Sequence, residues 1–419
     1  KDAQTNEVQL LLDDKTALLE YVIGDSILYI FYLDKKQLLL FEKPIPNSIL
    51  KNSIKMLHRA LNDYELIKDS PDKAYQDFTK NASWCYENLL KEPLSKAQGI
   101  SQLIIIPDGE LAHLPFETFL VEKALSGQDY SNLHYLLKDY TISYNYSATL
   151  WKENLEQKQP KNNGQMLAMA AHYSVQVNSS HSESRLPVYD RLRQALNALP
   201  AARIEVEALE KAYAGFFGFD NLASEKTFKE KAAGYAVIHL AMHGFLDKKN
   251  PILSSLAFTE DGDSLENNFL QAYEISKMEL NSDLVVLSAC ETGYGKFEKG
   301  NGTASLARAF MYAGASALVV SLWQVNDAST SLIMQNFYSN LAKGLPKDKA
   351  LQQAKLAYLE KINGFAAHPA FWSPFVLIGN SSPIEIQQKS ESKWLWIILG
   401  SSTFLIIGIG FAIRRKKHQ

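Results

Sequence analysis

Short apolar runs alternate with amphipathic stretches over the second half of the chain, and this alternation constrains the fold more than any other feature. Strands are predicted over 235–242, 283–289, 317–323 and 375–379. Helices are predicted over 202–214, 226–233, 303–313, 328–342 and 347–361. Strands that alternate with helices of roughly 10–15 residues form a parallel sheet covered on both faces, so we expect an α/β fold. Ligands of such sheets bind beyond the carboxyl ends of the strands.

The first half of the chain begins with a different pattern. Residues 18–43 alternate with a period of two around Gly24-Asp25 and Asp34-Lys35, which predicts β-hairpins. Residues 48–92 have helical spacing, and strands are predicted over 103–106 and 166–171. A Ser- and Asn-rich stretch over 172–187 is predicted to be a mobile loop. It divides an N-terminal part, 1–171, from a C-terminal part, 188–382.

Composition excludes several classes of protein. Hydrophobic residues make up 46% of the 419 residues, enough for a sizeable core. The 43 Lys and Arg residues nearly balance the 46 Asp and Glu residues, whereas nucleic-acid proteins usually carry a basic domain or stripe, so no nucleic-acid partner is expected. The two cysteines, Cys85 and Cys290, are too few for a disulfide framework.

The end of the chain has the hydropathy of a membrane anchor. Residues 394–413 carry no charge, and 20 helical residues span ~30 Å, the thickness of a bilayer core. A linker over 383–393 precedes this segment, and a basic tail over 414–419 comes after it. The sequence therefore predicts a C-terminal transmembrane helix and a single-pass membrane protein. The positive-inside rule puts the tail in the cytoplasm and the body on the extracytoplasmic, periplasmic side.

Two of the predicted strands end in a reactive residue. His243 comes directly after the strand over 235–242, and Cys290 directly after the strand over 283–289. If these strands are parallel neighbours, both side chains emerge at the same edge of the sheet. A histidine beside a cysteine stabilises the thiolate and protonates the leaving group. The backbone N–H groups of Gly244 and Cys290 are candidates for binding a developing oxyanion.

Other chemistry is less well supported by the sequence. His239 and His243 have the spacing of a zinc pair, but Leu240 stands where the metalloprotease motif needs Glu. The glycine-rich stretch 293–302 has Asn301-Gly302 where a phosphate-binding loop needs Lys followed by Ser or Thr. We therefore expect neither a metal nor an organic cofactor, and we expect Cys85 to be structural.

Five motifs of the chain resemble those of the CHAT family, which are caspase-like peptidases often found beside tetratricopeptide repeats. They are 103–117 (LIIIPDGELAHLPFE), 239–244 (HLAMHG), 288–293 (SACETG), 304–310 (ASLARAF) and 321–327 (SLWQVND). The resemblance covers about 14–380. It implies a caspase-like three-layer α/β sandwich with a mainly parallel central sheet. It also implies that 1–171 is a degenerate, pseudo-caspase-like supporting half and that 188–382 is the active half.

The resemblance also assigns roles to individual residues. His243 is similar to the histidine of the family's catalytic dyad, and Cys290 is similar to the nucleophile. Ser321 and Trp323 lie in a segment that resembles the place where caspases hold the substrate backbone. No Arg comes after them, so cleavage after Asp is not expected. Asp327 caps the helix that begins at residue 328, favours Lys or Arg at the cleavage site, or does both.

These observations together predict a membrane-anchored, caspase-like cysteine endopeptidase. Its expected partners are a protein substrate, the membrane through 394–413, and a regulatory partner or an upstream repeat domain. Two other functions stay open. The first is a catalytically silent scaffold or signalling adaptor with the same fold. The second is an acyl transferase with Cys290 as its nucleophile, although the sequence shows no pantetheine-binding pattern.

Overall fold

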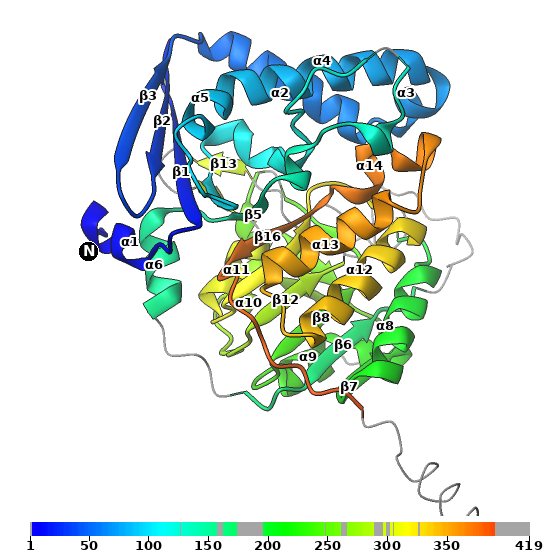
Figure 1. Cartoon of the computed structure of the whole chain (residues 1–419). Helices are drawn as coiled ribbons and strands as arrows, with labels where there is room; N and C mark the ends of the chain where they lie inside the picture. Colours follow the sequence, from blue (N-terminus) through cyan, green and yellow to red (C-terminus); the bar gives the residue numbers. More distant parts are fainter. Residues whose placement is uncertain are drawn as a thin grey trace, which may run out of the picture.

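One eleven-stranded sheet runs through the whole molecule (Figure 1). The structure is a computed structural model that describes residues 2–125, 127–156, 162–173, 196–247, 249–260, 266–288, 296–298, 302–304, 306–325 and 327–389. The strand order in the sheet is β3-β2-β1-β4-β5-β16-β15-β12-β8-β6-β7. The strands from the first half of the chain therefore occupy one end of the sheet, and most strands from the second half occupy the other.

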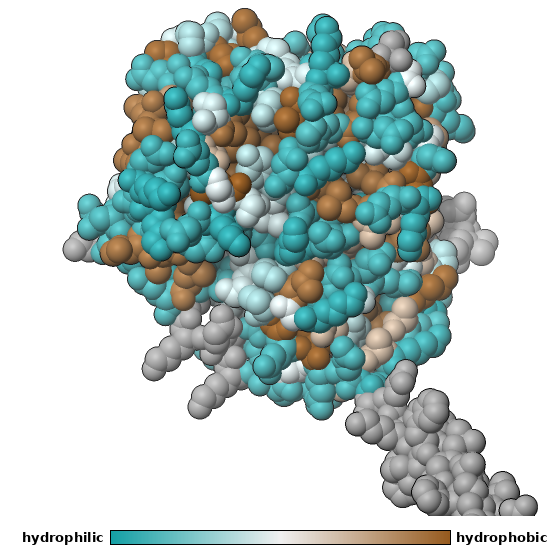
Figure 2. Space-filling view, in the orientation of Figure 1, coloured by the Kyte–Doolittle hydropathy of each residue, from teal (hydrophilic) through white to brown (hydrophobic). Residues whose placement is uncertain are grey.

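The first half contributes an antiparallel meander and two parallel strands. Its strands are β1 (Thr16–Ile23), β2 (Leu28–Leu33), β3 (Leu38–Lys43), β4 (Gln102–Ile106) and β5 (Thr141–Tyr144). The antiparallel pairs β1–β2 and β2–β3 confirm the predicted hairpins. β3 lies at the edge of the sheet, where Leu38 and Leu40 are about half exposed. Figure 2 shows apolar surface at the upper left, on the side of the molecule where Figure 1 places β3.

The second half contributes a block of parallel strands and one antiparallel strand, and β6 (Met166–Ala170) joins this block although it lies at the end of the predicted N-terminal part, 1–171. The other strands are β7 (Gly215–Phe219), β8 (Val237–Ala241), β12 (Leu284–Leu287), β15 (Ala317–Ser321) and β16 (Phe375–Gly379). β16 pairs antiparallel with β15 and parallel with β5. The parallel strands of the two halves therefore run in opposite directions through one continuous sheet.

Helices cover the sheet, as the alternating pattern predicts. The helices of the first half are α1 (Thr5–Leu11), α2 (Asn47–Asn62), α3 (Tyr64–Asp69), α4 (Pro71–Leu89), α5 (Lys91–Leu94) and α6 (Ala148–Glu156). Those of the second half are α8 (Pro200–Ala212), α9 (Glu225–Lys231), α10 (Ala272–Ile275), α11 (Leu306–Tyr312), α12 (Asp327–Ala342), α13 (Lys347–Leu359) and α14 (Pro369–Trp372). α8, α12 and α13 lie side by side over the sheet (Figure 1). Given the strand order, the rule that such crossovers are right-handed places α9, α10 and α11 on the face opposite α8.

Two small sheets complete the second half. One contains β9 (Gly244–Phe245), β10 (Ser255–Ala257) and β11 (Phe269–Gln271), and the other contains β13 (Lys296–Glu298) and β14 (Gly302–Ala304). The predicted helix over 303–313 begins only at Leu306, because β14 takes its first residues. Most of the predicted loop over 172–187 lies outside the described residues.

The structure corrects the membrane prediction. Among the described helices none is both long and apolar enough to cross a bilayer. The longest of them, α4, has 19 residues, but it is amphipathic and carries charged side chains along its length. The predicted transmembrane helix over 394–413 and the single-pass membrane localisation are therefore not supported. Residues 390–419 lie outside the described part of the chain.

Candidate functional site

His243 stands directly after β8, at the carboxyl end of the strand. Its backbone N–H donates to the Tyr173 hydroxyl at 2.9 Å, and that hydroxyl donates to the Ala257 carbonyl at 2.7 Å. The Tyr173 and His243 rings are 5.0 Å apart between centroids. Tyr173 is buried and lies just after β6, the strand beside β8. One aromatic side chain therefore fixes the backbone of His243 and covers one side of its ring.

The His243 imidazole is held by a backbone carbonyl. Its Nε2 lies 2.9 Å from the carbonyl oxygen of Asn197, in the segment that leads into α8. A carbonyl only accepts hydrogen bonds, so Nε2 is the nitrogen that carries the proton. In the neutral imidazole the lone pair is then on Nδ1, the nitrogen that can accept a proton from a reacting group. This arrangement suits a general base.

β12 brings the second predicted residue towards the same edge. It pairs with β8 in parallel, with Leu287 opposite Leu240, and the Ser288 N–H donates to the Leu240 carbonyl at 3.0 Å. His243 and Cys290 are each the third residue after this matched pair. Residues 289–295 lie outside the described residues, so the His243–Cys290 pair stays a prediction.

A buried group of polar side chains lies below this edge. His239 of β8 is fully buried, with Nδ1 at 2.9 Å from the Tyr338 hydroxyl of α12 and Nε2 at 3.3 Å from Glu205 of α8. The Ser288 hydroxyl donates to the other Glu205 oxygen at 3.1 Å. His239, one member of the zinc-like pair, therefore contacts the protein's own side chains through both ring nitrogens.

The residues expected to bind substrate lie at the end of β15 and directly after it. Ser321 is fully buried and pairs with Phe375 of β16. Trp323 is buried too, and its indole N–H donates to the Ala370 carbonyl at 3.2 Å. Any contact of these two residues with substrate is therefore made by their backbone. Asp327 is the first residue of α12, and the position of its side chain lies outside the described part of the structure.

Gly244, the other oxyanion candidate, opens β9 and lies opposite Leu256 of β10. The neighbouring His243 carbonyl accepts a hydrogen bond from the Ala257 N–H at 2.9 Å. These backbone contacts attach the residue after the candidate base to a small sheet. The described residues do not include Cys290, the other proposed donor of the oxyanion site.

The LPFE motif at 114–117 joins the two halves of the chain. Glu117 lies in the 3₁₀ helix η2 (Phe116–Thr118) and pairs with Lys355 of α13 at 3.0 Å, with both side chains buried. The Tyr144 hydroxyl donates to the second Glu117 oxygen at 2.6 Å. Cys85 is also fully buried, and burial raises the pKa of its thiol far above the usual value. These residues have structural roles.

A cluster of three glutamates has the geometry of a metal site. Glu225, Glu266 and Glu274 lie close enough together to hold a metal ion, but the Lys229 ammonium contacts all three, at 2.7, 2.8 and 2.9 Å. Burial raises the pKa of Glu225 to about 7, although Lys229 opposes this shift. Because a cation of the chain already occupies the centre of the cluster, we assign no metal to it.

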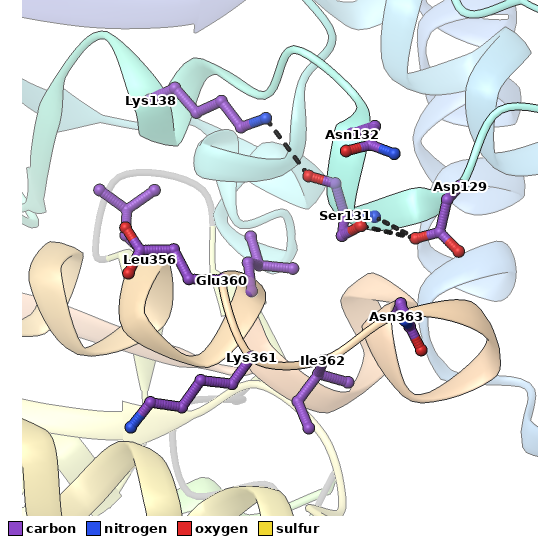
Figure 3. Close-up of a pocket in the computed structure, with 10 residues that line it drawn as sticks. Asp129, Ser131, Asn132, Lys138, Leu356, Glu360, Lys361, Ile362 and Asn363 are labelled. Carbon is purple, nitrogen blue, oxygen red and sulfur yellow. Dashed lines mark hydrogen bonds between the residues drawn. The ribbon is translucent and has the colours of Figure 1, made fainter.

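A cavity of about 790 Å³ opens beside the end of α13 (Figure 3). Asp129 accepts hydrogen bonds from the Ser131 N–H and O–H, and the Lys138 ammonium donates to the Ser131 carbonyl. Of the charged residues that line the cavity, Asp129 and Lys138 are thus already engaged with the chain. None of the predicted site residues lines it.

Sequence reasoning did not single out Tyr173, Asn197, Glu205 or Tyr338. Asn197 acts through its backbone carbonyl, which has no residue-type signature. Glu205 did carry a signal. It lies on the apolar side of its helix with Ala202, Val206 and Leu209, where a charged residue needs a buried partner.

Comparison with known proteins identifies the relatives of this chain. The solved structure of the Saccharomyces cerevisiae separase–securin complex at 2.6 Å superposes with a TM-score of 0.55 and 10% identity, over 90% of this chain and 31% of that one. At this identity the likeness shows the fold alone.

Two curated relatives are tetratricopeptide repeat protein 28 of Homo sapiens, 34% identical over 116 residues, and of Mus musculus, 32% identical over 127 residues. These matches cover 28% and 30% of this chain but 5% of each relative. The family model described as the CHAT domain matches residues 79–380, well over half of the 419 residues. The motifs that predicted this family are thereby confirmed, and the chain belongs to the CHAT domain family.

Proposed function

We propose that this chain is a cysteine endopeptidase in which Cys290 is the nucleophile and His243 is the general base and acid. The observation that carries the proposal is the setting of His243. It stands at the carboxyl end of β8, with Nε2 committed to the Asn197 carbonyl, beside the strand that leads to Cys290. The caspase-like fold supports the same assignment.

The proposed mechanism depends on the tautomer of His243. Nδ1 accepts the Cys290 thiol proton, and the thiolate attacks the carbonyl carbon of the scissile peptide bond. The Gly244 and Cys290 N–H groups stabilise the resulting oxyanion. The imidazolium then protonates the leaving amine, and water hydrolyses the acyl-enzyme with His243 again as base. The Asn197 carbonyl keeps the ring oriented.

The substrate proposed is a protein held by its backbone along 321–325. The Gln324 carbonyl already accepts a hydrogen bond from the Tyr64 hydroxyl at 3.1 Å, so the first half of the chain helps to shape this edge. Asp327 would favour Lys or Arg at the cleavage site. A regulatory partner or repeat domain would control access, in keeping with the names of the curated relatives.

Activity-based labelling tests the proposal. Acyloxymethyl-ketone probes with Lys, Arg, Asp or Leu at the cleavage position are added to the full chain. We expect labelling that disappears in Cys290→Ala and falls sharply in His243→Ala. Cys85→Ala is the matched control, because its buried thiol should contribute no label. If a basic probe reacts best, Asp327→Asn should weaken that probe selectively. Absence of label at Cys290 in every form of the protein would favour the scaffold or adaptor function.

A further inference from the structure

Glu205 contacts side chains from both segments that lead to the proposed dyad. It lies on α8 and is buried, with 6% of its surface exposed. One carboxylate oxygen accepts from Ser288, just past the end of β12. The other lies 3.3 Å from His239 on β8, and neither atom of that contact has a hydrogen-bond partner among the described residues.

The cluster joins four parts of the fold. The Tyr338 hydroxyl and Nδ1 of His239 lie 2.9 Å apart, and Nε2 of the same ring lies 3.3 Å from Glu205, which also accepts from Ser288. Because the side chains come from α12, β8, α8 and the residue just past β12, their contacts fix these elements to one another.

The position of Glu205 also links it to both members of the dyad. Ser288 precedes Cys290 by two residues on the same segment. Asn197, whose carbonyl holds the His243 ring, lies three residues before Pro200, where α8 begins. A shift of α8 relative to the sheet would therefore move the Asn197 carbonyl away from His243. The same shift would release Ser288.

We propose that Glu205 is a positioning residue for the peptidase site, setting the Asn197–His243 contact through α8 and the approach of Cys290 through Ser288. This inference rests on the proposed function, because it concerns the alignment of the same dyad. Its neighbours on α8 show why packing alone does not explain the residue. An apolar side chain would suit a face shared with Ala202, Val206 and Leu209 better than a carboxylate does.

Glu205→Gln is the main test variant, since it keeps the size of the side chain but removes its charge and half of its accepting capacity. Glu207→Gln is the matched control. Glu207 lies on the same helix, is exposed, and pairs with Arg203 at 2.9 Å near the surface. We expect Glu205→Gln to lower the rate of probe labelling at Cys290 roughly 10- to 100-fold, as a misplaced reacting group does. Glu207→Gln should leave this rate unchanged.

The pH profile of labelling separates positioning from other effects. Glu205 faces His239, Tyr338 and Ser288, while His243 faces Tyr173 and the Asn197 carbonyl. If Glu205 aligns His243, its loss weakens support for the thiolate, and the midpoint of the profile moves to higher pH. If Glu205 acted only through its charge, its removal would move the midpoint to lower pH. An unchanged midpoint with lower thermal stability would mean a purely structural role, and either of these two results overturns the proposal.

Two further comparisons test the linkage. Ser288→Ala should lower labelling in the same direction as Glu205→Gln, and the two changes together should cost less than their separate effects combined, because they remove one contact. In a His243→Ala background, Glu205→Gln should have little further effect, since residues that act as a unit are not additive. Fully additive effects in both comparisons would contradict the proposal. If Glu205→Gln does not fold, Ser288→Ala still gives a result.

Histidine-ring NMR keeps this inference distinct from the proposed function. In Cys290→Ala protein with ¹⁵N-labelled histidine, the His243 signal is assigned by its loss in His243→Gln. Nε2 should be the protonated nitrogen, and Glu205→Gln should shift this signal while Glu207→Gln should not. If the unaltered protein never labels but Glu205→Gln shifts the His243 signal, the peptidase assignment fails and the positioning role stands. If labelling occurs and neither the rate nor the signal responds to Glu205→Gln, only the positioning role fails.

Discussion

Breaking the buried Lys355–Glu117 pair should destabilise the protein severely. The two side chains are 1% and 4% exposed, and Nζ lies 3.0 Å from Oε1. Glu117 also accepts from the Tyr144 hydroxyl, which itself accepts from the Phe116 N–H at 2.7 Å. Lys355→Met keeps much of the side-chain volume but leaves the carboxylate without its cation. We expect a loss of about 3–5 kcal/mol in the free energy of unfolding, the cost of an unpaired buried charge.

An exposed pair in the same chain supplies the control. Lys91 pairs with Glu87 at 2.8 Å one helical turn away, with the two side chains 58% and 52% exposed. Water screens this pair and each partner stays hydrated without the other, so Lys91→Met should change stability by at most about 0.5 kcal/mol. The same substitution should thus cause a large loss of stability at the buried lysine and almost none at the exposed one.

Urea unfolding followed by circular dichroism measures both variants. The double variant Lys355→Met/Glu117→Gln should recover part of the lost stability, because the amide carries no charge and still accepts from Tyr144. A loss below about 1 kcal/mol for Lys355→Met would refute the reasoning. So would a double variant no more stable than the single one. Because the pair joins η2 of the first half to α13 of the second, its loss should also affect both halves in one transition.

Three other predictions concern buried groups. Cys85 should resist iodoacetamide in the folded protein and react on unfolding, since burial raises the pKa of its thiol; mass spectrometry of the modified peptide checks this. Burial lowers the pKa of His368 to about 3, so as the pH drops the unfolded chain binds a proton at this residue before the folded chain does. The free energy of unfolding should therefore fall between pH ~6.5 and 3, by up to about 1.4 kcal/mol per pH unit. Denaturation at several pH values should show a shallower fall in His368→Asn. Tyr173→Phe should cost about 1–3 kcal/mol, because the His243 N–H and the Ala257 carbonyl lose their buried partner; thermal melts together with labelling of the variant test it.

Local sequence patterns predict many of the individual strands and helices, because the hydrophobic pattern of an element depends only on neighbouring residues. The strand at 375–379 is observed with the predicted bounds, and the strand predicted over 235–242 is observed at Val237–Ala241. Apolar runs of this length have few other ways to bury both faces. The opposite directions of the two halves were not predicted. That arrangement depends on β16 pairing with both β15 and β5. Because β5 and β16 lie far apart in the chain, the local sequence of neither strand indicates that they pair. The apolar run at 394–413 was predicted from its composition to be a membrane helix, and the described structure does not support that prediction.

The residues of the candidate site also differ in whether a local sequence pattern could predict them. His243 could be found because a histidine followed by glycine at the end of an apolar run is itself a local pattern. Its supports come from Asn197 and Tyr173, 46 and 70 residues away along the chain, and one of them acts through its backbone alone. A charged residue within an apolar helical stripe is the exception, since burial obliges it to find a partner. Glu205 and Lys355 both satisfy this criterion: Glu205 contacts His239 of β8, and Lys355 pairs with Glu117 of η2. A charged residue within an apolar helical stripe can therefore indicate a long-range contact that hydrophobic periodicity does not predict.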